Sequence, residues 1–307
     1  MIYTVTLNPS LDYLVYTEAL RPGRLCRTDG ETLHPGGKGV NISLVCAALG
    51  LPTRALGFIA GRTGALFASL LAETGVEYDF CRLDEGMTRI NVKISSHERT
   101  GLNGAGPEIP PAALIELAGK LDLLGEGDWL VLSGSLPAGV PADVYARMLS
   151  RVQGSGVKTV VGAAGDALKN ALPHEPDLVK LTVNELDALI GGAPHSPSGL
   201  AACGCELQRA GAREVLIVCG TEGAVLVPTA GQALYLACAA LGAAQQPVGM
   251  GDAMTAGWLY AREQGLSDAE TLRWAIAAGS AAREAAWMPS RTAIEQALAA
   301  VGKPRTV

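Results

Sequence analysis

Short apolar runs alternate with longer stretches of helical period along most of the 307-residue chain. A strand, a helix and a further strand in succession form a βαβ unit, and such units build parallel sheets. The sequence therefore predicts an α/β fold with a central, mostly parallel sheet flanked by helices. The strand-like runs lie at Ile2–Leu7, Trp129–Leu132, Thr159–Val161, Leu178–Leu181 and Val215–Val218.

Glycine follows several predicted helices, as expected for residues that end a helix in a left-handed conformation. These helices are predicted at Val40–Leu49, Ala65–Glu73 and Ala253–Gln264. The alternation resumes after the Gly/Pro-rich stretch Gly191–Gly199, so this stretch is interpreted as a loop. A single domain is predicted over residues 1–307.

Two segments, at about 12–33 and 87–104, have no helix between their short alternating strands. We expect them to pair as a small antiparallel β lid. A lid suits a reaction with which water competes, such as phosphoryl transfer.

Composition excludes several functional classes. The net charge is −6 and no Lys/Arg cluster stands out, which argues against a nucleic-acid partner. The longest apolar run, Ala233–Ala244, is too short to span a bilayer, and Met1–Tyr16 lacks the pattern of a signal peptide. The seven cysteines form no Cys-x-x-Cys pair. We therefore expect reduced thiols in a cytoplasmic protein with no membrane segment.

The segment Gly249-Met250-Gly251-Asp252 leads directly into a predicted helix. Backbone N–H groups at a helix start can hold an anion, so Gly249, Met250 and Gly251 are predicted to form an anion hole. Asp252 has two interpretations. It is either the N-cap of the helix or a general base that takes a hydroxyl proton.

A second loop-to-helix junction lies upstream, at Pro35–Asn41. Adjacent glycines allow a ligand to approach the backbone, while Lys38 and Asn41 supply donors one turn apart. The segment is not a P-loop, because Gly39 stands where Ser or Thr would bind magnesium. The first strand also lacks the Gly-x-Gly-x-x-Gly motif of dinucleotide-binding folds, so hydride transfer is disfavoured.

Six segments in order along the chain together resemble the phosphofructokinase B group of the ribokinase superfamily, most closely its 1-phosphofructokinase and tagatose-6-phosphate kinase branch. The resemblance implies a ribokinase-like sheet with a small β lid, ATP and Mg²⁺ as co-reactants, and a homodimer formed through the lids. The segments are Asn8–Asp12, Pro35–Asn41, Thr88–Lys93, Asn103–Pro107, Ser133–Pro137 and Gly249–Asp252.

On the sugar side, the resemblance implies that Asp12 binds hydroxyl groups and that Gly37, Lys38 and Asn41 hold the acceptor end of the substrate. The alternative interpretation of Asp12 is that it forms a turn after Pro9. Arg89 is a candidate for the substrate phosphate, assisted by Arg27, and the alternative for Arg89 is an exposed strand arginine. Ser135 lies where a strand ends, either at a ligand site or simply in a turn.

On the nucleotide side, Gly220, Thr221 and Gly223 resemble the loop over the ATP phosphates, although a hairpin turn explains them equally well. Lys180 is expected to face the phosphates, and Glu185 to hold Mg²⁺ through water. Gly279 and Ser280 resemble the adenine edge, with tight helix packing as the alternative.

Several positions depart from the family pattern. Met250 stands between the anion-hole glycines in place of alanine, and Thr182 replaces an asparagine before Glu185. Val218 replaces Ser or Thr, Gly162 replaces a common Asp, and Gly101 stands where the lid strand often has Glu. These departures affect nucleotide handling more than sugar binding.

The expected activity is ATP-dependent phosphorylation of a ketohexose phosphate, with Asp252 as base and fructose 1-phosphate as acceptor. The alternatives are a tagatose-6-phosphate kinase or a catalytically weak protein that binds sugar phosphates.

Overall fold

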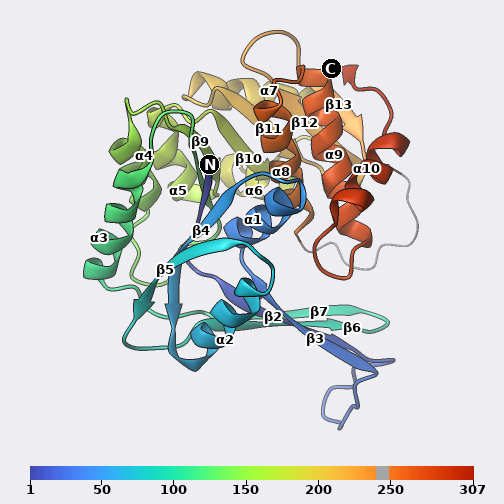
Figure 1. The fold of residues 1–307 in the computed structure, drawn as a ribbon. Coiled ribbons are helices and arrows are strands. Elements are labelled where there is room, and N and C mark those ends of the chain that lie inside the picture. The colour runs from blue at the N-terminus through green and yellow to red at the C-terminus, as the bar shows by residue number, and fades with distance from the viewer. Residues whose placement is uncertain (240–248) are drawn as a thin grey trace.

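A ten-stranded sheet forms the centre of the computed structural model, which describes residues 1–239 and 249–307 (Figure 1). Neighbouring strands are parallel from β11 to β5, and β12, β13 and β14 extend the sheet as antiparallel strands. The predicted central, mostly parallel sheet is thus confirmed. In spatial order the strands are β14 (Arg305–Thr306), β13 (Leu234–Ala237), β12 (Gly223–Val227), β11 (Glu214–Val218), β10 (Leu178–Thr182), β9 (Lys158–Gly162), β8 (Trp129–Ser133), β1 (Ile2–Thr6), β4 (Thr53–Ala60) and β5 (Glu77–Leu83).

Helices cover both faces of this sheet. Strand β8 is apolar on both faces: Leu130 and Leu132 belong to the core on one side, and Trp129 and Val131 to the core on the other. Both faces of the sheet therefore need a layer of helices. The first face packs against α3 (Pro111–Lys120), α4 (Val144–Val152), α5 (Gly165–Ala171), α6 (Val183–Ile190) and α7 (Pro197–Arg209), with short 3₁₀ turns η1 (Leu121–Leu123) and η2 (Leu172–His174). The second packs against α1 (Lys38–Ala48), α8 (Met250–Glu263), α9 (Asp268–Glu284) and α10 (Arg291–Ala300).

Three helices begin earlier than predicted. Helix α1 begins at Lys38, α2 (Gly61–Ala72) at Gly61 and α8 at Met250. Their first turns contain glycine, whose low helix propensity delays the predicted start, but packing of the following apolar residues overrides that preference. For α8 the shift places Asp252 inside the helix. Pro247 and Val248, which precede this motif in the sequence, lie outside the described residues.

A four-stranded sheet extends away from the main sheet as the lid, in the order β3-β2-β6-β7 (Figure 1). Its strands are β3 (Gly30–Gly36), β2 (Ser10–Tyr16), β6 (Arg89–Ser95) and β7 (Arg99–Asn103). The pairs β2/β3 and β6/β7 are antiparallel, but the central pair β2/β6 is parallel. The expectation of a wholly antiparallel lid was therefore wrong. Both β2 and β6 follow strands of the parallel sheet and leave it in the same direction.

The seven cysteines are free thiols, as expected from their spacing. Within the described part of the chain, none of the helices combines the length and the apolar character needed to cross a membrane.

Replacement of a central core residue is expected to destabilise the protein strongly. Leu132 on β8 is 0% exposed, so Leu132→Ala should lower the free energy of unfolding by about 2–5 kcal/mol through lost burial and a cavity. Denaturant unfolding would measure this. The matched control Leu123→Ala, at a position 75% exposed, should change it by less than about 0.5 kcal/mol. Equal effects of the two variants would contradict this description of the core.

Candidate active site

The first turn of α8 carries the candidate base. Gly249 is the N-cap residue, with a φ of 78° that favours glycine, and no side chain caps the helix. Asp252 is the third helical residue, and its Oδ2 accepts a hydrogen bond of 2.9 Å from Nδ2 of Asn41 on α1. The N-cap interpretation of Asp252 was therefore wrong. Its carboxylate faces another element instead of the N–H groups of its own helix.

Asp252 lies in a buried electrostatic environment. Its residue is only 6% exposed, and burial raises the pKa of its carboxyl group above the usual value, while Lys180 and Asn41 act in the opposite direction. Lys180 on β10 is also buried, and burial lowers the pKa of its ammonium group against the opposing charge of Asp252. A carboxylate with a raised pKa is a better proton acceptor, which suits a general base.

A cavity of about 540 Å³ opens in front of Asp252, between the carboxyl ends of β1 and β8 and the lid. This is the position at which open α/β sheets bind ligands, because the strand order reverses at β1. We call it the acceptor cavity. Most predicted sugar-side residues line it, together with part of the α8 turn: Asp12, Gly37, Lys38, Asn41, Arg89, Ser135, Gly249 and Asp252.

Asp12 is fixed in the lid. It lies within β2, and its Oδ1 accepts hydrogen bonds from Oγ of Ser10 at 2.8 Å and Nδ2 of Asn91 at 2.9 Å. The turn-former interpretation of Asp12 was therefore wrong. A carboxylate held in this way can accept hydrogen bonds from the hydroxyl groups of a ligand.

Arg89 begins β6 and is partly buried, so the exposed-arginine interpretation was also wrong. Its Nε donates to the carbonyl oxygen of Asn8 at 3.1 Å, and its Nη1 to that of Gly104 at 3.3 Å. Burial lowers the pKa of its guanidinium group, which nonetheless stays charged because arginine ionises so far above neutral pH. Among the described residues Nη2 has no hydrogen-bond partner, so its two donors are available to a ligand.

Arg27 is placed differently. It is exposed on the connection between β2 and β3, where its carbonyl oxygen accepts a hydrogen bond from Oγ1 of Thr17 at 3.0 Å. It does not line the acceptor cavity of its own chain. The structure therefore does not bring Arg27 to the predicted sugar site.

Lys38 and Glu185 form an ion pair of 2.7 Å between Nζ and Oε1 at the edge of the acceptor cavity. Oε2 of Glu185 accepts from the backbone N–H of Thr182 at 2.8 Å, and Glu185 in turn donates its N–H to Oγ1 of Thr182. This is a capping box at the start of α6, and it explains the threonine that departs from the family pattern. Burial by itself would raise the pKa of Glu185, but the charges of Lys180 and Lys38 outweigh it and hold that pKa below its usual value.

Gly162 has a comparable explanation. A Cβ atom at this position would lie 2.5 Å from Oγ of Ser133, so the aspartate common in the family would require this hydroxyl to move. Ser133 is buried, whereas Ser135 reaches the acceptor cavity beyond the end of β8.

A second cavity, of about 450 Å³, lies on the other side of the α8 turn, and we call it the donor cavity. The hairpin between β11 and β12 borders it through a 3₁₀ turn, η3 (Gly220–Glu222). The hairpin interpretation of this segment is thus correct, and the same turn brings Gly220 and Thr221 to the cavity. Met250, Gly251, Thr182 and Val218 also line it.

Four predicted nucleotide residues do not line the donor cavity. A Cβ atom on Gly279 would lie 2.6 Å from Cγ of Met254, so Gly279 permits close packing of α9 on α8. Oγ of Ser280 accepts from the backbone N–H of Ala239 at 3.2 Å. Gly223 begins β12, and Nζ of Lys180 lies below Gly251, where a Cβ atom would be 2.8 Å away. Direct roles of these residues in nucleotide binding stay predictions.

The described residues contain no group of three or more His, Cys, Asp or Glu side chains arranged to hold a metal ion. Both carboxylate oxygens of Glu185 already have protein partners. This donor set fits Mg²⁺ that keeps its waters and arrives with phosphate groups, and it does not fit a dedicated protein cage.

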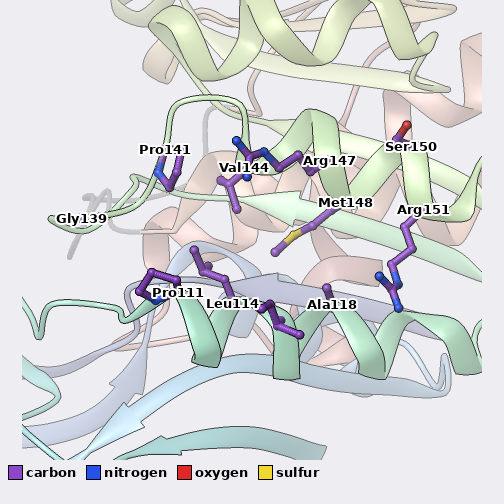
Figure 2. Close-up of a pocket in the computed structure, with 11 residues that line it drawn as sticks. Pro111, Leu114, Ala118, Gly139, Pro141, Val144, Arg147, Met148, Ser150 and Arg151 are labelled. Atoms are coloured by element: carbon purple, nitrogen blue, oxygen red, sulfur yellow. The ribbon is translucent and has the colours of Figure 1, made fainter.

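A further cavity, of about 700 Å³, lies between α3 and α4, away from Asp252. Figure 2 shows Leu114 and Ala118 on α3 opposite Met148 on α4. Its two arginines are paired, Arg147 with Asp143 and Arg151 with Asp122. This apolar space therefore offers no unpaired charge for catalysis.

The sequence interpretation missed several residues of the acceptor cavity. Asn91 and Lys93 follow Arg89 at intervals of two, so the period of a strand already placed them on its face. The residues concerned are Thr6, Asn8, Ser10, Asn91, Lys93, Asn103, Gly134, Leu136, Ala164 and Ala167.

Comparison with known proteins adds to this geometry. Residues 6–288 match the pfkB family of carbohydrate kinases. The chain is 35% identical to a 1-phosphofructokinase of Bacillus subtilis, over 92% of each chain, and 37% identical to a D-tagatose-1-phosphate kinase of Bacillus licheniformis, over 91% of each. A crystal structure of Escherichia coli phosphofructokinase-2 in complex with substrates and products superposes with a TM-score of 0.91 at 28% identity, covering 97% of this chain and 98% of that one.

Removal of the Thr182 cap is expected to cost stability. Thr182→Ala deletes the hydroxyl that accepts from Glu185, so the free energy of unfolding should fall by about 1 kcal/mol in denaturant titrations. Thr182→Ser keeps a hydroxyl and should restore most of that loss. An alanine variant as stable as the wild type would show that the capping box does not stabilise α6.

Proposed function

Since the chain belongs to the pfkB family of carbohydrate kinases, we propose that it transfers the γ-phosphoryl group of ATP to the C6 hydroxyl of fructose 1-phosphate, yielding fructose 1,6-bisphosphate and ADP. The observation that carries the proposal is the position of the α8 turn between two cavities. Gly249 and Asp252 border the acceptor cavity, while Met250 and Gly251 border the donor cavity. A phosphoryl group that passes from one cavity to the other would cross this turn.

In the proposed reaction the C6 hydroxyl oxygen of the sugar forms a bond to the γ-phosphorus, and Asp252 takes the proton of that hydroxyl. The bond between that phosphorus and the bridging oxygen of ADP breaks at the same time. Asn41 orients the carboxylate through its hydrogen bond to Oδ2. Burial excludes water and keeps Asp252 sufficiently basic for this role.

Charge on the transferred group would be neutralised from two sides. The free N–H groups of the first α8 turn point out of the helix, and the helix dipole adds partial positive charge. Lys180 supplies positive charge directly below Gly251, where a Cβ atom would come within 2.8 Å of its Nζ. Glu185 would hold Mg²⁺ through water, and the ion would there neutralise phosphate charge of bound ATP.

A second acceptor of the same kind is D-tagatose 1-phosphate. The Bacillus licheniformis relative is named as a kinase of this sugar phosphate. Tagatose and fructose differ only in configuration at C4, so both present a C6 hydroxyl and a phosphate on C1. Kinetic comparison of these two sugars with tagatose 6-phosphate would rank the substrates. Binding of a sugar phosphate without turnover would instead identify a catalytically weak binding protein.

We also propose that the protein forms a homodimer through its lids in the cytoplasm. The face of the lid opposite Asp12 carries Ile90, which is 38% exposed, and Leu102, which is 61% exposed. Leu25, on the connection between β2 and β3, is 90% exposed. Exposed apolar side chains on the lid and on its connecting loop support an interface with a second copy.

Asp252→Asn is expected to lower kcat roughly 10²- to 10⁴-fold, because the amide cannot take the hydroxyl proton. A coupled assay would measure turnover, and calorimetry should show that fructose 1-phosphate still binds. Asp166→Asn, at a side chain 75% exposed and outside both cavities, is the control and should keep the wild-type kcat. A kcat of Asp252→Asn within threefold of wild type would refute the role of this residue.

Leu102→Asp is expected to convert the proposed dimer into a monomer, because it introduces a charge into an apolar interface. Light scattering coupled to size-exclusion chromatography would give the mass. Leu123→Asp, at a position on the main body that is even more open to solvent, should leave the mass unchanged. A monomeric wild-type protein, or a dimeric Leu102→Asp variant, would rule out the lid interface.

A further inference from the structure

We propose that Lys93, on the inner face of the lid, binds the phosphate that the substrate already carries, and that Gly101 keeps this lysine available. The inference rests on the proposed function, because it assigns the phosphate of that acceptor a place in the same cavity. The supporting observation is which hydrogen-bond and ion-pair partners each cationic side chain of the acceptor cavity has.

Of the described residues, three with cationic side chains line the acceptor cavity, namely Lys38, Arg89 and Lys93. Lys38 is neutralised by Glu185 at 2.7 Å, and Arg89 already donates to two backbone carbonyl oxygens. Lys93 donates only to Oδ1 of Asn103, at 2.8 Å, within the described part of the chain. An ammonium group has three donors, so Lys93 keeps two of them and its full charge.

Strand pairing explains why Lys93 has no acidic partner in the part of the chain that the structure describes. Its neighbour on β2 is Leu14, and its neighbour on β7 is Gly101. A Cβ atom on Gly101 would lie 3.8 Å from Cδ and 3.9 Å from Nζ of Lys93, so a longer side chain there would run along the lysine. A carboxylate at position 101 would therefore pair with Lys93, whereas glycine leaves it open to a ligand.

The acceptor cavity combines carboxylate acceptors with cationic donors. Asp12 and Asp252 supply acceptors for sugar hydroxyl groups, and both are held by neutral amides, those of Asn91 and Asn41. Lys93 and the remaining donors of Arg89 lie on the lid strand next to these groups, at intervals of two residues. A ligand that carries both hydroxyl groups and a phosphate dianion matches this arrangement.

The test compares Lys93→Met, which removes the charge at similar length, with Lys93→Arg, which keeps it. Lys93→Met should raise KM for fructose 1-phosphate about tenfold or more, with kcat changed less than about threefold and KM for ATP unchanged. Lys93→Arg should restore most of the affinity. A KM for Lys93→Met within threefold of wild type would overturn the proposal.

Gly101 provides an independent test that leaves Lys93 in place. Gly101→Glu should raise KM for fructose 1-phosphate in the same direction as Lys93→Met, while Gly101→Gln, of similar size without charge, should raise it clearly less. Equal effects of Gln and Glu would show that bulk, and not charge, matters at this position, which would overturn the role given to Gly101.

Calorimetry separates this inference from the proposed activity. If the wild type binds fructose 1-phosphate without turnover and Lys93→Met weakens that binding tenfold, the phosphate site stands and the kinase proposal fails. If the wild type turns over fructose 1-phosphate and Lys93→Met does so with the same KM, the kinase proposal stands and the phosphate site at Lys93 is refuted. If the wild type neither binds nor phosphorylates any ketohexose phosphate, both proposals fail.

Discussion

The burial of one carboxylate at the first turn of α8 is the constraint on which the site depends. Placing Asp252 in the first turn of α8 brings it to the end of the helix that carries partial positive charge, and placing Lys180 beside it supplies the opposite charge. An ion removed from water needs such partners, since an isolated buried carboxylate would be protonated. The arrangement requires α1, β10 and α8 to meet, and the central sheet with its helices on one face brings them together.

The lid completes the cavity with a different kind of surface. Its inner face carries polar side chains that hold one another, as Asn91 holds Asp12, while its outer face exposes apolar ones such as Leu102. The period of two along each strand separates these faces. The lid thus shapes the sugar side, whereas the α8 turn and the β11–β12 hairpin shape the nucleotide side.

The departures from the family pattern have local structural explanations. Thr182 forms a capping box with Glu185, and Gly162 leaves room for the hydroxyl of Ser133. Met250 is 6% exposed and packs toward Gly279, so its longer side chain fits between α8 and α9 without displacing the turn. These substitutions are accommodated by neighbours and leave Asp252, Asn41 and Lys180 in contact or close proximity.

The sequence by itself determined the parallel sheet, because strands buried on both faces are continuous apolar runs, which can be recognised in the sequence alone. It also identified the two glycine-containing loops, since the backbone conformation that favours glycine before a helix depends only on neighbouring residues. The pairing of Asp252 with Asn41, of Lys38 with Glu185 and of Lys93 with Asn103 was decided only by tertiary structure. The same holds for the placement of Arg27 outside the cavity and for the parallel β2/β6 pair. Such contacts join residues that the chain separates by up to 211 positions, and their geometry depends on how whole elements pack, which no local pattern encodes.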